Sequence, residues 1–346
     1  MLTNQFKINY SVGSIANGVK TDTFTFFLLF FYSNIIGLNP GLAGTAIFIA
    51  LCVDAFTDPL MGTISDRTNT SFGRRHPYMF ISFIPMSLGY IFLFAPRQDW
   101  DMSQSDLFVW MTIFTILTRI GMTLFDIPHR AFGGEITKNY NERTLLMSWR
   151  EMFAWVAGLS NAFLGYGVFF ASTPEFPQGQ LNPDAWFPFA LTGALIMIIS
   201  VLYSSLSTKN EINSLSKWSG SVSLGAILNE LKIALGNKSF LIFFFGNLFL
   251  SLAWGLANTL TLFVNTYFWE FEATQIKYFL PIYLFATLFA FYLTPIMVKL
   301  YDKRIIVLVC IGAVGLLSPA AFIMYNLGLT PEKGSMQLVF FISSFL

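Results

Sequence analysis

The most constraining feature of the chain is a succession of long apolar stretches. Nine of them are each long enough to cross a bilayer, which takes about 20 residues of α-helix, and a tenth begins near Met336 and runs to Leu346. Because the hydrocarbon core offers backbone groups no hydrogen-bond partner, each stretch is expected to be a helix. The nine stretches cover residues 11–36, 42–64, 76–96, 106–131, 148–172, 186–206, 239–267, 275–298 and 304–327.

The composition agrees with a membrane-spanning chain. Hydrophobic residues make up 55% of it and charged residues 11%, whereas about 25% of a soluble domain is charged. We therefore predict an all-α polytopic protein of the cell inner (plasma) membrane that contacts the lipid bilayer. Basic residues gather only in the loops, so no face for nucleic acid is expected. Cys52 and Cys310 lie in apolar stretches and are expected to pack rather than to pair.

The loop lysines and arginines predict the orientation. Of the 20 in the chain, four lie well inside the apolar stretches. Arg97, Lys277 and Lys333 lie in one set of loops, where a residue at the end of a stretch is counted with the adjoining loop. The remaining thirteen lie in the opposite set, which includes the N-terminus. This bias predicts that the N-terminus lies in the cytoplasm. The thirteen are Lys7, Arg67, Arg74, Arg75, Lys138, Arg143, Lys209, Lys217, Lys232, Lys238, Lys299, Lys303 and Arg304.

The longest polar segment separates two groups of apolar stretches. We predict an N-terminal six-helix bundle over 1–206, a cytoplasmic linker over 207–238 with an amphipathic part at 224–235, and an incomplete C-terminal bundle over 239–346. A parallel repeat of six helices is a transporter pattern. Because the last stretch is still running at Leu346, we expect a fragment of a twelve-span protein, with about nine complete helices and part of a tenth. A genuine short protein is the alternative.

Two carboxylates, Asp54 and Asp58, lie inside the second apolar stretch. A spacing of four places them one turn apart on one helix face, and at about 1.5 Å per residue they lie past the bilayer midplane from Leu42. A charge at such depth costs at least about 2.5 to 3.5 kcal/mol on insertion scales. Two close carboxylates also resist ionising together, so one is expected to bind a proton, or both to share a cation. The pair therefore predicts a coupling-ion site for Na⁺ or H⁺.

A compact charged loop follows these acids directly. Asp66 and Arg67 end the apolar stretch, and Arg74 and Arg75 precede the next one. A positive anchor at the membrane surface would explain the arginines but not the buried acids. We interpret the four residues as a cytoplasmic gate that makes and breaks ion pairs with the inner ends of other helices, for which Glu135 and Glu142 are candidates.

Ionisable side chains also lie inside the first and fourth stretches. Lys20 and Asp22 point in different directions on a helix, and Lys20 either faces the interior or snorkels to the surface. Arg119, Thr123 and Asp126 share one helix face at spacings of four and three. They either bracket a polar ligand or belong to an interhelical salt-bridge network.

Two later side chains complete the candidate substrate site. Arg150 is expected to face the same cavity as Asp126, where a guanidinium suits sugar hydroxyls or a carboxylate; an interfacial anchor is the alternative. Trp254 lies on a polar line with Asn258, and its ring can either stack on a sugar or pack in a core. Pro128 is expected to end or bend the fourth helix.

These residues resemble the pattern of a known family. The segment Asp54-Ala-Phe-Thr-Asp58-Pro-Leu-Met-Gly, followed by Ser65-Asp-Arg67 and Gly73-Arg-Arg-His-Pro77, is similar to the glycoside–pentoside–hexuronide:cation symporters, a melibiose permease-like family of the major facilitator superfamily. The segment Asp126-Ile-Pro-His-Arg-Ala-Phe-Gly-Gly-Glu135, with Arg150, resembles the family's fourth helix, inner loop and fifth helix. The matches cover about residues 10–160.

The resemblance implies a major facilitator fold of two six-helix bundles and alternating access. It implies that Asp54 and Asp58 bind the cation, that the hydroxyl of Thr123 helps there, and that Asp126 and Arg150 bind sugar. The chain departs from the family at three places. Thr57 replaces an asparagine beside the cation, His129-Arg130 replaces Phe-Trp, and Gly18 stands where a sugar-binding aspartate is expected. We expect Asp22, one turn later, to replace that aspartate.

We therefore predict a cation-coupled symporter of a sugar or glycoside, monomeric, without a cofactor, without catalytic residues, and without a metal beyond Na⁺ at Asp54 and Asp58. A transporter of the same fold for an organic anion or a lipid is the alternative, which the positive charges of Lys20, Arg119 and Arg150 allow. An enzyme is disfavoured because neither histidine has a metal-ligand partner at useful spacing. A channel is disfavoured because no filter-like loop is found.

Overall fold

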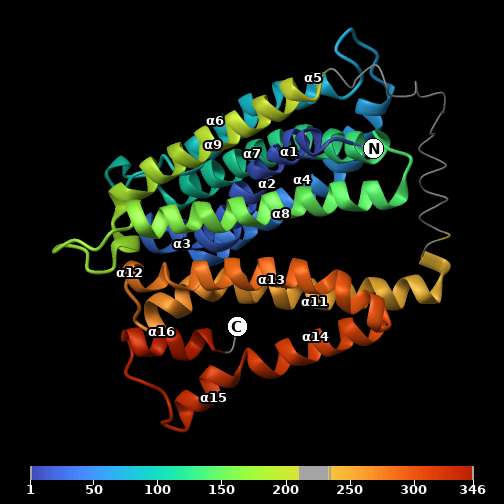
Figure 1. Cartoon of the computed structure of the whole chain (residues 1–346). Helices are drawn as coiled ribbons and strands as arrows, with labels where there is room; N and C mark the ends of the chain where they lie inside the picture. The colour runs from blue at the N-terminus through green and yellow to red at the C-terminus, as the bar shows by residue number, and fades with distance from the viewer. Residues whose placement is uncertain (1, 210–232, 234, 345–346) are drawn as a thin grey trace.

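The computed structural model describes residues 2–209, 233 and 235–344, which form a helical molecule in two groups (Figure 1). Among these residues, eight helices are long and apolar enough to cross a membrane. The predicted all-α polytopic fold is confirmed. Most of the predicted linker, including nearly all of the amphipathic part at 224–235, lies outside the described residues.

The first apolar stretch is helical but changes type along its length. It begins with α1 (Asn4–Val12) and α2 (Ser14–Asp22), and then passes through the π turn η1 (Thr23–Phe27), α3 (Leu28–Phe30) and a second π turn, η2 (Phe31–Ile35). This stretch is not among the eight long apolar helices, two of which also contain a π turn. Turns of this kind often mark functional positions.

The other helices of the N-terminal bundle follow the predicted stretches closely. At Pro128 the sequence predicted an end or a bend of the helix, and the first of these is wrong, because α7 continues through Pro128 to Glu135. A proline at this depth is tolerated where neighbouring helices and hydroxyl side chains satisfy the freed backbone groups. The elements are α4 (Pro40–Arg67), α5 (His76–Ile81), α6 (Phe83–Leu93), η3 (Gln98–Trp100), α7 (Gln104–Glu135), α8 (Tyr140–Leu164), the π turn η4 (Gly165–Phe169), η5 (Gly179–Leu181), η6 (Pro183–Ala185) and α9 (Trp186–Ser207).

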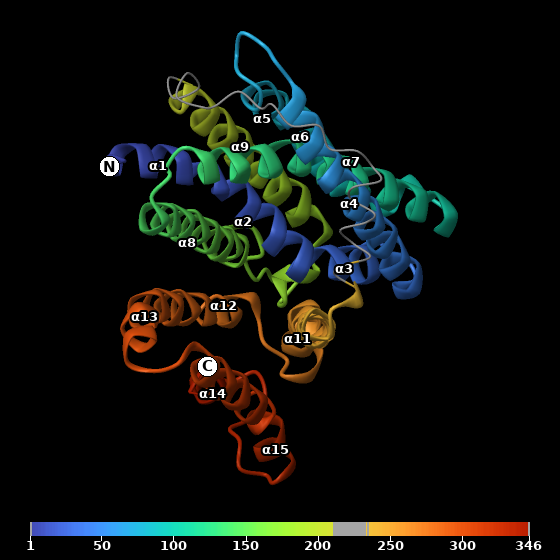
Figure 2. The same ribbon diagram turned by 90° about the vertical axis from the view of Figure 1, so that its right-hand side faces the viewer.

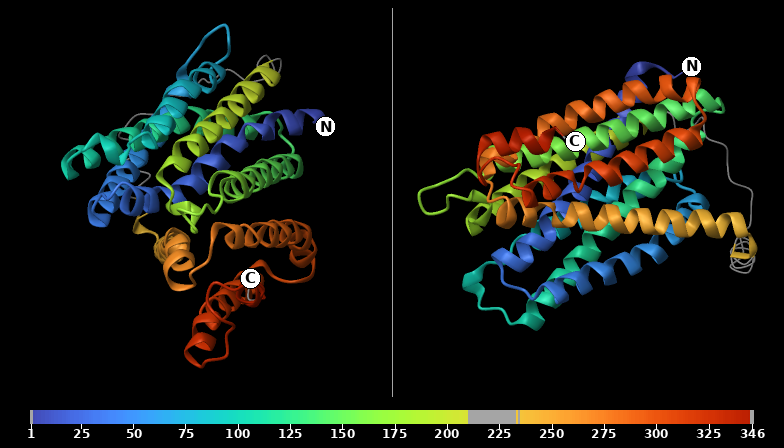
Figure 3. Two further views of the ribbon diagram at one scale, coloured as in Figure 1. Left: turned by 90° about the vertical axis from the view of Figure 1, so that its left-hand side faces the viewer. Right: turned by 90° about the horizontal axis from the view of Figure 1, so that it is seen from below.

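The second group of helices lies along one side of the first (Figures 1 and 2). Its α11 and α13 face the N-terminal bundle, whereas α14 and α15 lie on the far side, as the left view of Figure 3 also shows. The elements are α11 (Lys238–Phe263), the π turn η8 (Val264–Phe268), α12 (Ala273–Ile276), α13 (Phe279–Leu300), α14 (Lys303–Leu317), α15 (Ala320–Asn326) and α16 (Met336–Ser343).

The two groups are joined by hydrogen bonds at one end only, as far as the described residues show. Gln180, which is fully buried, donates to the hydroxyl of Thr266 at 3.3 Å and to the carbonyl of Phe271 at 3.4 Å. Tyr267 donates to Asn34 at 2.7 Å at the same end. The left-hand end of Figure 1 is therefore the closed end of the molecule.

An aromatic core supports this closed end. Trp186 is fully buried, lies 4.6 Å from Phe170 between ring centroids, and donates its indole N–H to the carbonyl of Gln180 at 3.1 Å. Phe27 packs edge-on against the same indole at 5.9 Å. Rings of this size provide much of the buried apolar area, so the core fixes Gln180 in place for its contacts with the second group.

Helix contact in the N-terminal bundle depends on glycine. A Cβ added at Gly18 of α2 would lie 1.9 Å from the carbonyl oxygen of Ala154 on α8, which is backbone and cannot rotate away. Small residues allow membrane helices to approach in this way. The close approach of α2 and α8 therefore rules out any side chain at position 18.

Gly18→Ala is predicted to destabilise the fold by about 1–3 kcal/mol, the usual cost of overpacking, although alanine is the better helix former. Gly44→Ala in α4 is the matched control, because nothing lies within 4 Å of a Cβ added there. Thermal unfolding in detergent measures both. Equal unfolding midpoints for the two variants would show that the α2–α8 contact is looser than described.

Candidate functional site

Asp54 and Asp58 of α4 face α7, and each meets a different partner. Arg119 forms an ion pair with Asp54, and its side chain is 12% exposed against 21% for the aspartate. One turn along, the hydroxyl of Thr123 donates to Asp58 at 2.6 Å. Because the two residues are four apart on each helix, the two contacts lie one helical turn apart along the α4–α7 interface. The charge of Asp54 is thus balanced, whereas Asp58 receives only a hydroxyl.

Arg119 and Asp126 were expected either to bracket a polar ligand or to belong to an interhelical salt-bridge network. Both side chains form ion pairs in the structure, and their role toward a ligand stays a prediction. Thr57 lies beside the acids, and its hydroxyl is 3.5 Å from the carbonyl of Asp54 in its own helix. The ion-pair partners of Arg119 and Asp126 lie on other helices, so they could not be derived from spacing within one helix.

Lys20 lies close to the Asp54–Arg119 ion pair. Its ammonium is 5.8 Å from the ring centroid of Phe24, and the guanidinium carbon of Arg119 is 5.6 Å from the same ring. The face of this ring attracts both cations. Of the two alternatives for Lys20, the interior position fits these contacts.

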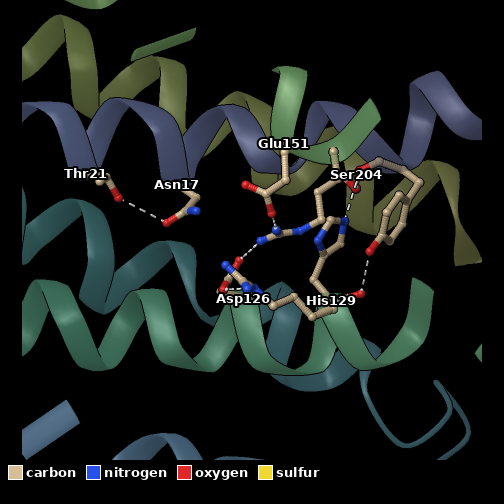
Figure 4. Close-up of polar contacts among 9 residues, drawn as sticks. Asn17, Thr21, Asp126, His129, Glu151 and Ser204 are labelled. Carbon is tan, nitrogen blue, oxygen red and sulfur yellow. Dashed lines mark hydrogen bonds and ion pairs between the residues drawn. The ribbon is translucent and has the colours of Figure 1, made fainter. Parts of the chain in front are cut away.

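A second charged group links α7 and α8. Arg150, whose side chain is 1% exposed, forms ion pairs with Asp126 and with its neighbour Glu151. Arg130, which is 51% exposed, donates to the other oxygen of Asp126 at 2.6 Å. Figure 4 shows this group, with Asp126 and Glu151 approaching from different helices. Sequence reasoning missed Glu151, although it is the residue next to Arg150.

A fully buried histidine lies beside this group. The ring of His129, which is labelled in Figure 4, stacks on Tyr10 at 4.1 Å and on Phe125 at 4.8 Å between ring centroids. Its Nε2 is hydrogen-bonded to the carbonyl of Tyr10 at 3.0 Å. Ser204 donates to the same carbonyl at 3.1 Å. This histidine, singled out in the sequence only as a departure from the family, holds α1 against α7 and α9.

Asp22 packs against the backbone of α8 rather than beside Arg150. A Cβ added at Gly158 would lie 2.1 Å from Oδ2 of Asp22, so only glycine leaves room for this carboxylate. The same oxygen is buried and has no hydrogen-bond partner among the described residues. On the same helix, Thr21 donates to Asn17 at 3.3 Å (Figure 4).

A cavity of about 470 Å³ lies between the two groups of helices, and Trp254 lines it. Trp155 of α8 and Asn258 of α11 also line it. Trp155 was not singled out from the sequence, because one tryptophan on a membrane helix more often signals packing or an interface. The structure thus separates the candidate substrate residues into a charged group inside the N-terminal bundle and an aromatic wall at the cavity.

The charged loop after α4 forms ion pairs within the N-terminal bundle. Arg74 and Arg75 both bind Glu135 at the end of α7, and Arg75 also binds Asp66 at 2.7 Å. Burial lowers the pKa of Arg75, while Glu135 and Asp66 act in the opposite direction. Arg67 is the last residue of α4. Of the two expected acidic partners, Glu135 takes part.

Glu142 has other contacts. It accepts hydrogen bonds from Thr137 at 2.7 Å and from the backbone of Leu2. It therefore holds the start of the chain against the loop between α7 and α8, and it does not join the arginines.

Comparison with known proteins gives one family and one fold. A model of the family described as MFS/sugar transport protein matches residues 9–345. The chain is 32% identical over 206 residues to the uncharacterized symporter sll1374 of Synechocystis sp., which is 58% of this chain and 36% of that protein. It is 28% identical over 237 residues to the putative glycoside/cation symporter YagG of Escherichia coli, which is 68% of this chain and 49% of that protein. The chain thus spans half or less of the length of these two curated relatives.

A solved structure shares the fold. The inward open conformation of the xylose transporter XylE from E. coli superposes with a TM-score of 0.55 at 16% sequence identity, and the superposition covers 99% of this chain and 79% of that one. At this identity the likeness concerns the arrangement of helices alone.

Arg150→Gln is predicted to cost about 3–5 kcal/mol of stability, because it leaves the buried Asp126 with only its exposed partner. Arg130→Gln removes the other arginine of the same aspartate and is the matched control, with an expected cost below about 1 kcal/mol. Unfolding of the two variants in detergent gives the comparison. A cost at Arg130 as large as that at Arg150 would contradict the assignment of Arg150 as the main partner.

Proposed function

The chain belongs to the MFS/sugar transport protein family, and we propose that it moves a sugar or glycoside across the membrane together with Na⁺ or H⁺. The observation that carries the proposal is the unequal pairing of two acids one turn apart. Asp54 has a cationic partner in Arg119, whereas Asp58 has a hydroxyl. A carboxylate charge at this depth is expensive unless it is paired, so Asp58 is the group that benefits most from a visiting cation.

In this proposal Asp58 carries the coupling ion. Thr123 donates to it at 2.6 Å, and the same hydroxyl oxygen, after rotation, can serve as a ligand for a hard cation, which prefers oxygen. Asp54 and Thr57 stand one turn and one residue away and complete the candidate set. Arg119 already balances the charge of Asp54, so a single positive charge suffices to neutralise Asp58.

The candidate sugar site uses hydrogen-bond capacity that the fold leaves open. Among the described side chains, Oδ2 of Asp22 and the Nε atoms of Arg119 and Arg150 are buried without a partner. Sugar hydroxyls both donate and accept, so they suit the carboxylate as well as the two guanidinium groups. Lys20 and Asp126 supply further charge beside them, and Trp254 provides a ring face at the cavity.

Alternating access follows from the one-sided contact between the two groups. We propose that the N-terminus lies in the cytoplasm, as the loop charges predict, and that residues 1–206 and 239–346 move as two bundles. The end closed by Gln180 and Thr266 is then the outer end, and the molecule is open to the inside. The ion pairs of Arg74 and Arg75 with Glu135 belong to the inner end, where they brace the N-terminal bundle for closure.

Coupling is reciprocal in this scheme. A cation at Asp58 raises the affinity for the sugar, and the sugar raises the affinity for the cation by the same factor. When a cation binds without sugar, the buried hydrogen-bonding groups of the sugar site stay unpaired. Closing the two bundles around the site is then less favourable. The two ligands therefore cross together.

Asp58→Asn is predicted to abolish uptake driven by a Na⁺ or H⁺ gradient in membrane vesicles while leaving sugar exchange at equal concentrations intact. The amide keeps the shape but not the charge, so no cation is required. Asp184→Asn, at an exposed carboxylate 3.4 Å from Arg97, is the matched control and should retain gradient-driven uptake. Uptake by Asp58→Asn that still follows the cation gradient would refute the assignment.

Cysteines at positions 34 and 267 provide a test of the closed end. The side chains there are hydrogen-bonded across the bundles at 2.7 Å. In a chain whose two native cysteines are replaced by serine, a short bifunctional thiol reagent is predicted to arrest transport in the Asn34→Cys, Tyr267→Cys double variant. Each single variant, treated with the same reagent, should transport normally. Unchanged uptake after complete cross-linking would show that this end need not open.

A further inference from the structure

The cavity between the bundles is built from matching stripes on facing helices. On α8 and η4 the lining residues Trp155, Leu159, Ala162 and Tyr166 recur at spacings of four, three and four. On α11 and η8 four residues recur at the same spacings, beginning at Trp254. This is the period of one helix face, so two faces oppose each other along the length of the cavity. The second stripe consists of Trp254, Asn258, Thr261 and Asn265.

Three π turns meet at the outer end of this cavity. Each supplies lining residues: η1 contributes Phe26 and Phe27, η4 contributes Tyr166, and η8 contributes Asn265. π turns are rare, and they occur often where a helix positions a side chain for function. Their coincidence around one space, from helices far apart in the sequence, singles out the cavity as a ligand site.

The cavity lining is uncharged but borders charge. None of the described side chains that line it is ionised at neutral pH. One turn inward of Phe26 lies Asp22, and one turn inward of Trp155 lies Glu151, which binds Arg150. A ligand that spans both regions therefore has a polar part on the inner side and an uncharged, largely apolar part in the cavity.

Polar groups within the lining distinguish an aromatic occupant from an alkyl chain. The hydroxyls of Tyr166 and Tyr283 have no hydrogen-bond partner among the described residues, and Asn258 donates to the carbonyl of Trp254 at 2.8 Å, which leaves its own oxygen as an acceptor. An alkyl chain would leave these groups unpaired at a cost. A ring with hydroxyl substituents would stack on the tryptophans and also satisfy the polar groups.

The size of the cavity agrees with such a ring. A cavity of about 150 Å³ is enough for one benzene molecule, and this one measures about 470 Å³. It therefore has room for an aryl group of one or two rings and part of the attached sugar. Trp155 and Trp254 remain 41% and 58% exposed, so their faces are open to a ligand.

We propose that the cavity binds the aromatic aglycone of a neutral glycoside between Trp155 and Trp254. The sugar then lies on the inner side of the cavity, beside the charged group of Asp126 and Arg150. The inference rests on the proposed function, since it names the class of substrate for that site. It names a neutral sugar rather than a uronate because Arg119 and Arg150 already form ion pairs with Asp54 and Asp126.

Binding to the purified protein tests this by calorimetry. The probes are matched phenyl and methyl glycosides of glucose, galactose, xylose and glucuronic acid, with octyl glucoside and lysophosphatidylcholine as alkyl probes. For the neutral sugar that binds, the phenyl form is predicted to bind about tenfold or more tightly than the methyl form, because it buries a ring. Trp155→Ala and Trp254→Ala should each remove most of that preference.

Trp149→Ala is the matched control, because Trp149 lies on α8 and stacks on Phe153 without lining the cavity. It should keep the phenyl preference. Equal affinities for phenyl and methyl glycosides in the wild type would overturn the aglycone site and leave the proposed function standing; this comparison needs no variant to fold. Tighter binding of the alkyl probes or of the uronates would also overturn it. Binding of none of the glycosides would overturn both proposals.

Discussion

The compensation of charge inside the N-terminal bundle is the constraint on which the remaining structure depends. A lone charge in the hydrocarbon layer is costly, so each one requires a partner from another helix or a reason to remain unpaired. Arg119 with Asp54, and Arg150 with Asp126, provide such partners. Each pair joins two helices and therefore fixes their register as well as their charge.

Asp58 and Asp22 lie inside apolar stretches and have no arginine partner among the described residues, and they define what the bundle can do. Asp58 holds a hydroxyl, and Asp22 presses against Gly158 with one oxygen unpaired. These are the positions where a cation and a polyhydroxyl ligand would relieve the largest cost. The paired residues act as a frame, and the unpaired ones provide the binding energy, so cation and substrate sites can be close without competing for the same side chain.

The second group of helices adds what the first lacks. It contributes no ionised side chain to the cavity lining, and instead supplies Trp254, amides and hydroxyls. Contacts through Gln180 hold the bundles together at one end, with the π turns just inside. Charge chemistry thus resides in one bundle and ring recognition lies between the two, an arrangement that lets the second bundle move without breaking buried ion pairs.

Much of this could be predicted from sequence, because lipid leaves the backbone few choices. The helices follow from the lengths of apolar stretches, and the importance of Asp54 and Asp58 follows from their depth. The partner of Asp54 could not be predicted, since the register between α4 and α7 is set by packing that spacing within one helix does not encode. Pro128 was expected to end or bend its helix, and α7 continues through it, because a buried helix can retain a proline where its surroundings satisfy the freed backbone groups. Trp155 could have been found, because its spacing to Leu159, Ala162 and Tyr166 forms the same stripe that begins at Trp254.

The central claim is that one acid of the pair is balanced by Arg119 and the other carries the coupling ion. The cation-to-sugar stoichiometry tests it most directly, measured in vesicles as the cation gradient that just balances a known sugar gradient. One cation per sugar is the predicted result, because Asp58 is the acid of this pair that has no positive partner among the described residues. Two cations per sugar would contradict it, since the second could bind only if Asp54 gave up its arginine.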